Sequence, residues 1–520
     1  MTIRRFLSLW LPRLAADRAR RLHRIDPAAP LAAVARIENA ERLVCVDINA
    51  TRLGLQPGLS LADAHARHPN LVAVEAAPHE EARLLERMCD WCSRFTPLAA
   101  LDGTDGLMLD VSGVAHLFGG EAGLAEEAVR RLRGQGIEAV PGIASNPPAA
   151  WALARFSAQK IAPGNVSDKA FMKIFHDLPL AALKLDGATV ADMARAGLRH
   201  IGDVALRPRA PIAARFGRMP IARLDALKGL ERASIQPRFA PPAFAAERRF
   251  ASPIATIEAI EASLQKLADD LVVLLERQAK GARAFELSLY RVDGEVRRIG
   301  VGASRPINEA RALLRLFAEK LAGPQEDAID AGFGVDLMRL SCLIAEPLAP
   351  SQSEIERAHE AERAGALADL IDRLSARLGS RAVTRRALVD AHLPEQAEAA
   401  APAALSEART KAFPSSLAGD GLEAPARPLR LFARPEPIEA MAEVPDGPPL
   451  RFRWRRVVHD VAAIEGPERI APPWWRRDGG PTRDYFRAED SEGRRFWLYR
   501  EGLLGHETAR VTWFLHGVFA

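Results

Sequence analysis

Two short apolar segments, far apart in the chain, constrain its fold more than any other feature. Residues 6–17 read FLSLWLPRLAAD and residues 101–112 read LDGTDGLMLDVS. Each apolar run has the length of a buried strand and is too short for a typical helix. We therefore expect both segments to be strands at the centre of one sheet.

The acidic residues of these two segments are unequally distributed. The second contains Asp102, Asp105 and Asp110, whereas the first has no acid before Asp17. Transfer of a nucleotide by two metal ions needs several anionic oxygens that converge within about 4 Å of both cations. A sheet with acids on only one of its two central strands is a poor candidate for such a site.

With the flanking PLAALDGTDGLMLDVSGVAHLFGG and the later GIASNPPAAWALARF, the two segments resemble the palm of a Y-family translesion DNA polymerase. The resemblance implies that the family's metal-binding Asp falls at Ser8 and a second acidic position at Trp10. It also implies that the family's Asp-Glu pair falls at Asp105 and Gly106. Only Asp105 still has a carboxylate, so we expect no catalytic residue, no bound metal, no cofactor and no efficient nucleotide transfer. Trp10 is predicted to be a buried packing residue.

An active enzyme remains the alternative. In that interpretation the chain is a low-efficiency translesion polymerase whose rearranged site uses Asp102, Asp105 and Asp110. The fingers segment of the family also binds the triphosphate through Tyr and Arg, which the resemblance places at Ile48 and Thr51. Neither side chain binds phosphate as an Arg fork does, so nucleotide binding is expected to be weakened as well.

At 520 residues the chain is too long for a single core. The fold class is predicted to be α/β and α+β multidomain, with Y-family-like palm, fingers, helical thumb and little-finger domains and a small Trp-rich β module. The predicted divisions are palm 1–25 and 78–175, fingers 26–77, thumb 176–242, little finger 243–350, helix and linker 351–449, and C-terminal module 450–520. No apolar run is long enough for a membrane span, and we expect a cytoplasmic protein. The four Cys are too few for a disulfide framework.

The predicted thumb is rich in basic residues. Residues 195–249 contain twelve Lys and Arg against four acids, a balance that suits either a phosphate backbone or a solvated surface. Within this block AGLRHIGDVA resembles the second half of a helix-hairpin-helix motif, whose backbone amides bind a DNA phosphate. In the first half, Lys184-Leu185-Asp186 replaces the expected GxG. The DNA-binding candidates in the thumb are Gly197, Arg199, Gly202 and Arg215.

Residues 245–347 show the pattern strand, helix, strand, strand, helix, strand, which resembles the little-finger domain of the same family. That domain lies across the DNA major groove. The exposed basic candidates here are Arg291, Arg297, Arg298 and Arg305.

The stretch between Pro394 and Pro428 has no periodic pattern and is predicted to be a linker. It leads into Arg-Pro-Leu-Arg-Leu-Phe, which resembles the bacterial sliding-clamp motif Gln-Leu-x-Leu-Phe. Leu429, Leu431 and Phe432 match the motif, and Pro428 stands where the motif has Gln. The alternative is an edge strand that packs on its own domain.

The last 71 residues hold five of the eight Trp of the chain. Trp and Arg dominate protein interfaces, so we predict a protein-docking module that uses Trp474, Trp475, Trp497 and Trp513. Stacking on single-stranded DNA is the competing use of the same residues.

The combined pattern, a Y-family body without its acids, a clamp-like peptide and a Trp-rich tail ending in WFLHGVFA, resembles the ImuB family. The resemblance implies a non-catalytic, SOS-induced adaptor in translesion synthesis. It also implies DNA, the sliding clamp, an ImuA-type RecA-like protein and an error-prone C-family polymerase as partners.

Overall fold

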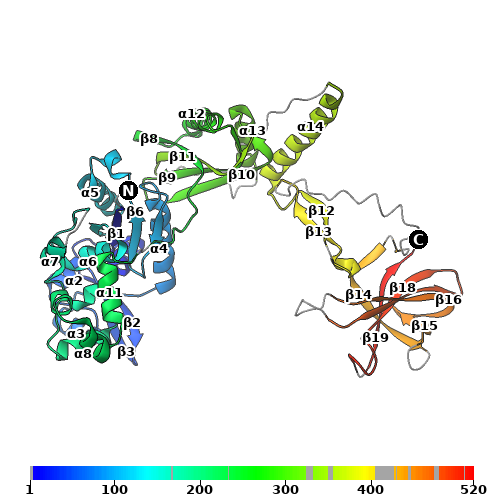
Figure 1. Ribbon diagram of the computed structural model, residues 1–520, viewed down its shortest axis with the longest axis horizontal. Helices are drawn as coiled ribbons and strands as arrows, with labels where there is room; N and C mark the ends of the chain where they lie inside the picture. Colours follow the sequence, from blue (N-terminus) through cyan, green and yellow to red (C-terminus); the bar gives the residue numbers. More distant parts are fainter. Residues whose placement is uncertain are drawn as a thin grey trace. The chain divides into compact units, whose positions relative to one another are not determined.

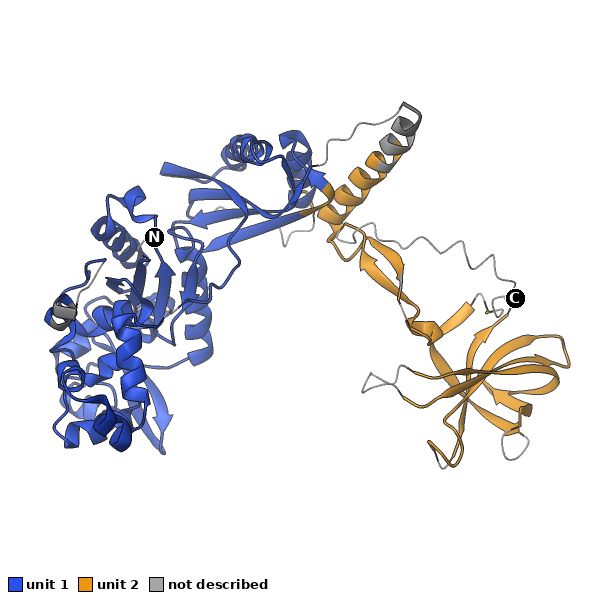
Figure 2. Ribbon diagram, viewed as in Figure 1, with its two compact units in different colours: residues 1–301, 306–321, 325–350 blue, residues 302–305, 322–324, 351–520 orange. Residues whose placement is uncertain are grey.

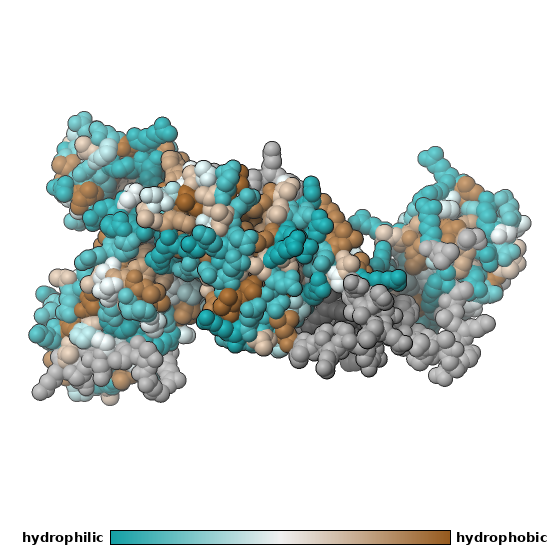
Figure 3. Space-filling model, turned by 90° about the horizontal axis from the view of Figure 1, so that it is seen from above, coloured by the Kyte–Doolittle hydropathy of each residue, from teal (hydrophilic) through white to brown (hydrophobic). Residues whose placement is uncertain are grey.

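The computed structural model consists of two compact units (Figures 1 and 2). The first contains residues 1–301, 306–321 and 325–350, and the second contains residues 302–305, 322–324 and 351–520. The structure describes residues 4–164, 168–231, 234–323, 332–348, 355–389, 391–404, 427–428, 430–442, 447–472, 480–508 and 510–519. No helix in these ranges is both long and apolar enough to cross a lipid bilayer. The visible surface of both units is mostly hydrophilic, with scattered hydrophobic patches (Figure 3).

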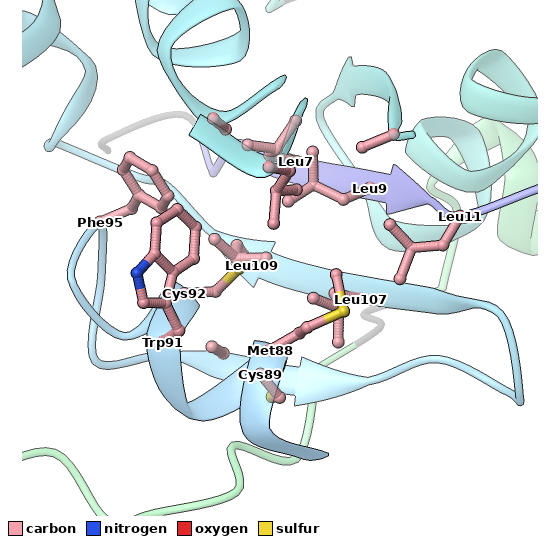
Figure 4. Packing of buried hydrophobic residues seen from close by; sticks show 14 of the residues in the cluster. Leu7, Leu9, Leu11, Met88, Cys89, Trp91, Cys92, Phe95, Leu107 and Leu109 are labelled. Carbon is pink, nitrogen blue, oxygen red and sulfur yellow. The ribbon is translucent and has the colours of Figure 1, made fainter. Parts of the chain in front are cut away.

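A four-stranded antiparallel sheet, in the order β5-β6-β1-β7, organises the first unit. Its strands are β1 (Phe6–Trp10), β5 (Ala99–Leu101), β6 (Gly106–Asp110) and β7 (Val140–Ala144), and its covering helices are α4 (Pro78–Cys92), α5 (Glu121–Gly134) and α6 (Pro147–Phe156). Because side chains alternate along a strand, Leu7 and Leu9 share one core with α4 and α5 (Figure 4). Phe6 packs on the opposite face, against α6. Both faces of β1 are therefore covered, as its apolar sequence indicates.

The first strand is shorter than predicted. The expected strand over residues 6–17 is wrong beyond Trp10, because helix α1 (Leu14–His23) occupies the rest of the segment. Pro12 lacks an amide hydrogen and cannot extend the ladder. Asp17 therefore lies on a helix rather than on the central strand.

The second segment forms half of a hairpin rather than one strand. The predicted strand over 101–112 is interrupted, since β5 ends at Leu101 and β6 begins at Gly106. Gly103 in the turn has a φ of +71°, a left-handed conformation that glycine adopts without a steric cost. The interruption places Asp102 and Asp105 in the turn, beside the end of β1.

The fingers-like part is a small sheet in the order β3-β2-β4. Its elements are β2 (Leu31–Ile37), β3 (Ala40–Val46), α2 (Ile48–Arg52), α3 (Leu61–Arg67) and β4 (Val72–Glu75). The thumb-like part is helical, with α7 (Asp168–Phe175), the 3-10 turn η2 (Leu180–Leu183), α8 (Gly187–Arg195), α9 (Ile201–Ala205), α10 (Arg209–Phe216) and α11 (Met219–Lys228). Thumb residues such as Ile201 and Leu227 share a buried cluster with Phe6, so the thumb and the palm sheet have a common core.

The strand and helix order predicted for residues 245–347 is confirmed. The elements are β8 (Phe244–Ile254), α12 (Ile257–Glu276), β9 (Lys280–Arg291), β10 (Val296–Ile307), α13 (Ala310–Leu321) and β11 (Val335–Pro347), with the sheet in the order β10-β9-β11-β8. Buried ion pairs join this part to the palm helices. Nη2 of Arg94 lies 2.8 Å from Oδ2 of Asp336, and Arg131 pairs with the same oxygen.

The second unit contains a closed six-stranded barrel. Its strands are β14 (Arg430–Ala442), β15 (Pro449–Trp454), β16 (Val457–Ile470), β17 (Arg483–Asp490), β18 (Arg495–Glu501) and β19 (Thr512–Val518). Helix α14 (Ile355–Leu378) and the strand pair β12 (Thr384–Leu388) and β13 (Glu398–Pro402) precede it. The predicted linker is therefore wrong at β13 and β14; residues 405–426 lie outside the described part of the chain.

Candidate functional site

Ser8 lies in the middle of the palm sheet, where the family places a metal-binding Asp. It pairs with Met108 on one side and with Gly142 on the other. Ser8 is fully buried, and its Oγ has no hydrogen-bond partner. A β-carbon built on the neighbouring Gly142 would lie 2.3 Å from the carbonyl oxygen of Ala150. Helix α6 therefore packs so closely on this part of the sheet that there is little room for a larger group.

The remaining acid of the pattern, Asp105, is hydrogen-bonded by two side chains. Trp10 donates its indole N–H to Oδ2 at 2.9 Å, and Arg155 donates from Nη2 to Oδ1 at 2.7 Å. The side chain of Asp105 is 48% exposed, whereas that of Arg155 is 7% exposed. Trp10 is only partly buried, which corrects the expectation of a buried packing residue. Its polar edge binds the acid that a metal ion would need.

Gly106 stands where the family has Glu, and Arg155 occupies that space. A β-carbon built on Gly106 would lie 2.9 Å from Nη2 of Arg155. The guanidinium group also lies over the ring of Trp10 at 5.6 Å and over the ring of Trp151 at 4.5 Å. We call Ser8, Trp10, Asp105, Gly106 and Arg155 the palm corner. A fixed positive charge takes the place of an acidic side chain there.

The other two acids of the alternative site are bound elsewhere. Asp102 accepts a hydrogen bond from Nζ of Lys184 at 2.7 Å. Asp110 binds Arg4 at 2.8 Å and the amide of Ser112 at 3.0 Å. Burial alone would raise the pKa of Asp110, but these hydrogen bonds outweigh it and lower the pKa. Asp105 and Asp110 lie at opposite ends of β6, about 16 Å apart at ~3.3 Å per residue.

The residues of the palm corner do not fit a two-magnesium site. Mg²⁺ prefers several oxygen ligands in octahedral geometry, and the corner offers one carboxylate that already binds a cation. Among the residues that the structure describes, no three His, Cys, Asp or Glu side chains are grouped as metal ligands. A magnesium ion beside Asp105 would have to displace Arg155.

The predicted triphosphate positions also lack a phosphate-binding group. Ile48 is 40% exposed on α2. The hydroxyl of Thr51 donates to the carbonyl oxygen of Asp47 at 2.7 Å. Both residues belong to the first turns of α2, so their side chains serve the helix or point to solvent.

The predicted DNA-binding residues of the thumb extend from the turn between α8 and α9 to α10. Gly197 has a φ of +81° in the connecting turn. Gly202 is buried, and a β-carbon there would clash with the ring of His176 at 2.2 Å. Arg199 and Arg215 are exposed. The geometry leaves these two arginines accessible to a phosphate backbone, whereas Gly202 serves packing.

The arginines of the little-finger-like part are less accessible than expected. The side chain of Arg291 is 11% exposed and pairs with Asp293 at 2.6 Å. Arg298 is 22% exposed, pairs with Glu286 at 2.9 Å and covers the ring of Phe239 at 4.1 Å. The prediction of exposed cations is therefore wrong for these two residues, and Arg297 is partly buried.

The clamp-like motif forms the start of strand β14. Leu431 pairs with Gly517 of β19 and is 37% exposed. Phe432 is partly buried against the barrel core. Leu429 lies outside the described residues. The structure thus places the motif as in the alternative interpretation, on its own domain.

Two of the predicted docking tryptophans stabilise the barrel instead. Trp497 is 3% exposed and Trp513 is 6% exposed. Trp513 belongs to the barrel core, and Trp497 packs with Tyr485 and Leu393. The expectation that these two residues present docking surface is wrong. Trp474 and Trp475 lie outside the described residues.

The sequence interpretation missed Arg155, the central cation of the palm corner. Trp151 and Arg155 are four residues apart on α6, so they share a helix face. That spacing, next to an isolated Asp in a degenerate site, is the signal that could have identified the residue. The sequence interpretation also missed the role of Lys184, because it considered this residue only as a departure from GxG.

Comparison with protein families gives two matches. Residues 16–155 match the impB/mucB/samB family, and residues 241–355 match the C-terminal domain of that family. The fold is thus that of a Y-family polymerase-like body followed by a β-barrel. Among solved structures, the chain resembles an insertion ternary complex of Dbh DNA polymerase, with a TM-score of 0.39, 13% identity, and coverage of 65% of this chain and 99% of that chain.

Comparison with characterised proteins gives a match over nearly the whole chain. Protein ImuB of Caulobacter vibrioides is 38% identical over 480 residues, which cover 90% of this chain and 100% of the relative. DNA polymerase IV of Ralstonia nicotianae is 24% identical over 261 residues, which cover 48% of this chain and 71% of the relative. The first match covers nine tenths of the chain, and the second covers about half of it.

Proposed function

This chain belongs to the ImuB family, and on that premise we propose that it is a non-catalytic, DNA-binding adaptor for translesion synthesis. The palm corner carries this proposal. Asp105 is bound by Trp10 and by Arg155, so the position of a catalytic metal is taken by a guanidinium group. On this proposal the polymerase body binds DNA without holding magnesium.

Primer extension by the purified full chain tests the catalytic part of the proposal. We expect no nucleotide incorporation with Mg²⁺ or Mn²⁺, either by the native protein or by an Asp105→Asn variant. Incorporation that Asp105→Asn abolishes would establish the alternative, an active low-efficiency polymerase. That alternative also requires Asp102 and Asp110, which bind Lys184 and Arg4 instead.

Duplex binding is the positive side of the same proposal. The exposed Arg199 and Arg215 are suited to backbone contacts. Replacing both by Glu is expected to weaken binding to primer-template duplex about tenfold and to reduce its salt dependence. Replacing Arg83, an exposed arginine of α4 outside the thumb, by Glu serves as the control. Equal losses in both variants would contradict a thumb-specific DNA interface.

The clamp tether is a further part of the proposal. Two register pairs, Arg430↔Val518 and Leu431↔Gly517, connect the start of β14 to β19 before the register shifts to Glu436. Because the start of β14 is paired separately, it can leave the barrel while residues 436–438 stay paired. This arrangement favours a peptide that binds in a groove of the sliding clamp.

Retention on immobilised sliding clamp tests the tether. The variant with Leu431→Ala and Phe432→Ala is expected to lose retention. Met441→Ala, a 66% exposed residue of the same strand, should keep it. Unchanged retention of the double variant would refute the assignment.

The family also suggests where such an adaptor acts. We propose that it works in the cytoplasm during the SOS response and connects DNA and clamp with an ImuA-type RecA-like protein and an error-prone C-family polymerase. Co-purification of these partners with the full chain, before and after DNA damage, is the measurement. Absence of both partners from the damaged sample would remove this part of the proposal.

A further inference from the structure

One end of the C-terminal barrel is open. The opening, which we call the barrel mouth, has a volume of about 840 Å³. Four segments meet there: the start of β14, the β15–β16 turn, the β17–β18 turn and the end of β19. Antiparallel strands in sequence order bring these segments to the same end of the barrel. Mouths of β-barrels are common ligand sites.

The barrel mouth combines aromatic rings with positive charge. The rings of Phe432, Trp454 and Phe519 line it, and each of these residues is partly buried. The cations of the lining are Arg430, Arg455, Arg494 and Arg495, and the imidazole of His459 also lines it. Within the described part of the chain, this lining contains no Asp or Glu. The surface is therefore suited to an anion with flat apolar groups.

His459 supplies a polar atom without a partner. Its side chain is 4% exposed, and its Nε2 has no hydrogen bond in the described structure. Nδ1 lies 2.9 Å from Oδ2 of Asp490. Nη2 of Arg494 also lies 3.3 Å from Nδ1, but the carboxylate is the nearer group and only accepts hydrogen bonds. Nδ1 therefore donates to Asp490, and Nε2 is left for another group. A buried polar atom that lines a cavity and lacks a partner within the chain is available to a water molecule or to a ligand.

Acidic residues behind the lining hold its cations and rings in place. Glu436 binds the indole N–H of Trp454 at 2.7 Å and also binds Arg455, whose guanidinium lies over the Trp454 ring at 4.8 Å. Asp490 binds Nε of Arg494 at 2.8 Å. The ring and the guanidinium group are thus positioned before any ligand arrives, which reduces the entropy cost of binding.

The turn between β15 and β16 presents two arginines at a conformational cost. Arg455 and Arg456 have φ values of 45° and 70°. Both positions are left-handed, and such hairpin turns favour Asn-Gly. Arginine is less favourable there than Asn or Gly, because its β-carbon crowds the backbone in the left-handed conformation. Positive charge at the rim of the barrel mouth is kept in spite of that cost.

We propose that the barrel mouth binds single-stranded DNA. Unpaired bases stack on aromatic rings and on guanidinium planes, and the phosphates pair with the arginines at the rim. Duplex DNA keeps its bases stacked inside the helix and cannot use these rings. An acidic peptide would match the charge but not the flat rings, so a single strand uses more of the lining.

Fluorescence anisotropy with a short labelled oligothymidylate and the full chain tests the proposal. The double variant Arg430→Glu and Arg495→Glu is expected to bind at least about tenfold more weakly and to lower the salt slope by about 1.4, since each phosphate contact on a single strand contributes about 0.7. Arg451→Glu is the matched control: its exposed pair with Asp460 lies on the same barrel but not in the mouth. An equal loss in the control would overturn the proposal.

A second variant tests stacking separately from charge. Phe519→Leu keeps apolar volume but removes the ring, and should weaken oligothymidylate binding about fivefold or more. Photo-crosslinking with iododeoxyuridine should label peptides that contain Trp454 or Phe519. Unchanged affinity of the Phe519→Leu variant for oligothymidylate would overturn the proposal, and so would crosslinks confined to the first unit. Displacement of the oligonucleotide only by an acidic peptide of the partner polymerase would also overturn it.

The site stands independently of the thumb interface proposed above. The mouth variants should leave duplex binding unchanged, whereas the Arg199 and Arg215 variant should weaken it. Unchanged duplex binding by the Arg199 and Arg215 variant would count against the thumb interface alone. Loss of oligothymidylate binding in the mouth variants alone would support the barrel mouth.

Discussion

The palm corner and the barrel mouth use their polar groups in opposite ways. In the palm corner, Trp10 and Arg155 bind both oxygens of Asp105. In the barrel mouth, Nε2 of His459 has no partner, and acidic residues fix the cations from behind. The acid of the palm corner is already bound by two donors of the chain, although Oγ of Ser8 has no partner, whereas the barrel mouth has room for a ligand.

The same contrast appears in the carboxylates of the two regions. Burial raises the pKa of Asp17, next to the palm sheet, to about 7. In the barrel, burial alone would raise the pKa of Asp490, but hydrogen bonds from His459 and Arg494 outweigh it and lower the pKa to about 2. Burial thus dominates the pKa of Asp17, whereas hydrogen bonds dominate that of Asp490.

The largest expected effect is the loss of stability when a tryptophan of the barrel core is replaced, compared with the loss when a tryptophan of the barrel mouth is replaced. Trp513→Ala removes a core side chain that is 6% exposed and should destabilise the barrel by about 3–5 kcal/mol. Hydrogen exchange of β17–β19 in the full chain measures the loss. Trp454→Ala, at the partly buried mouth, should cost less than half as much. Equal costs would remove the distinction between core and mouth.

Ser8→Asp tests whether the palm corner can become a metal site again. The new carboxylate would be buried between β6 and β7 without a cation, which should cost about 3 kcal/mol. Thermal unfolding of the first unit, with and without Mg²⁺, is the measurement. Ser8→Ala is the control and should be nearly neutral, because the native Oγ has no partner. Recovery of stability by Mg²⁺ would mean that the corner still accepts the ion.

Much of the fold follows from the sequence because its patterns are local. The order of elements over 245–347 depends on periodicity, and it is confirmed. The division into domains remains a prediction. The end of β1 was missed because Pro12 interrupts an apolar run whose hydrophobicity continues into α1.

The sites were harder to predict, because their contacts join residues far apart in the chain. Ser8 and Gly106 show that acids are missing, but only the fold brings Arg155 to Asp105 from 50 residues away. The Trp-rich tail indicated aromatic surface, yet burial depends on which side of the barrel each residue faces. Trp513 faces the core and Trp454 faces the mouth, and composition cannot tell them apart.

Asp17 and Asp490 predict opposite pH dependences for the two regions. A carboxyl whose pKa is raised on folding binds more protons in the native state, so the palm should lose stability as pH rises from about 4 to 7. The full pKa shift of Asp17 corresponds to a loss of stability of at most about 4 kcal/mol. Residual contact of Asp17 with water reduces the expected loss to about 2 kcal/mol. The pKa of Asp490 is lowered on folding, so its contribution to the stability of the barrel is lost as pH falls from about 4 to 2.

Unfolding of the two units as a function of pH measures these slopes. Asp17→Asn should remove the decline in the stability of the palm with rising pH and should raise that stability at neutral pH. The amide oxygen of the new side chain can still accept the hydrogen bond from the Glu138 N–H. Glu126→Gln, an exposed residue of α5, should change nothing. A palm that becomes more stable between pH 4 and 7 would contradict the assignment.

The smallest expected effect concerns the two side chains that bind Asp105 in the palm corner. Arg155→Met keeps the aliphatic stem between Trp10 and Trp151 but removes one donor from Asp105, and should cost about 1 kcal/mol because that carboxylate is half exposed. Trp10→Phe removes the other donor. Since both residues bind one acid, the double variant should deviate from additivity by about 0.5 kcal/mol or more. In the barrel mouth, Arg430 and Phe519 share no such acceptor, so Arg430→Met and Phe519→Leu should add in stability. Additivity in the palm corner, measured by the same unfolding assay, would mean that Asp105 is held by the surrounding backbone and not by its two donors.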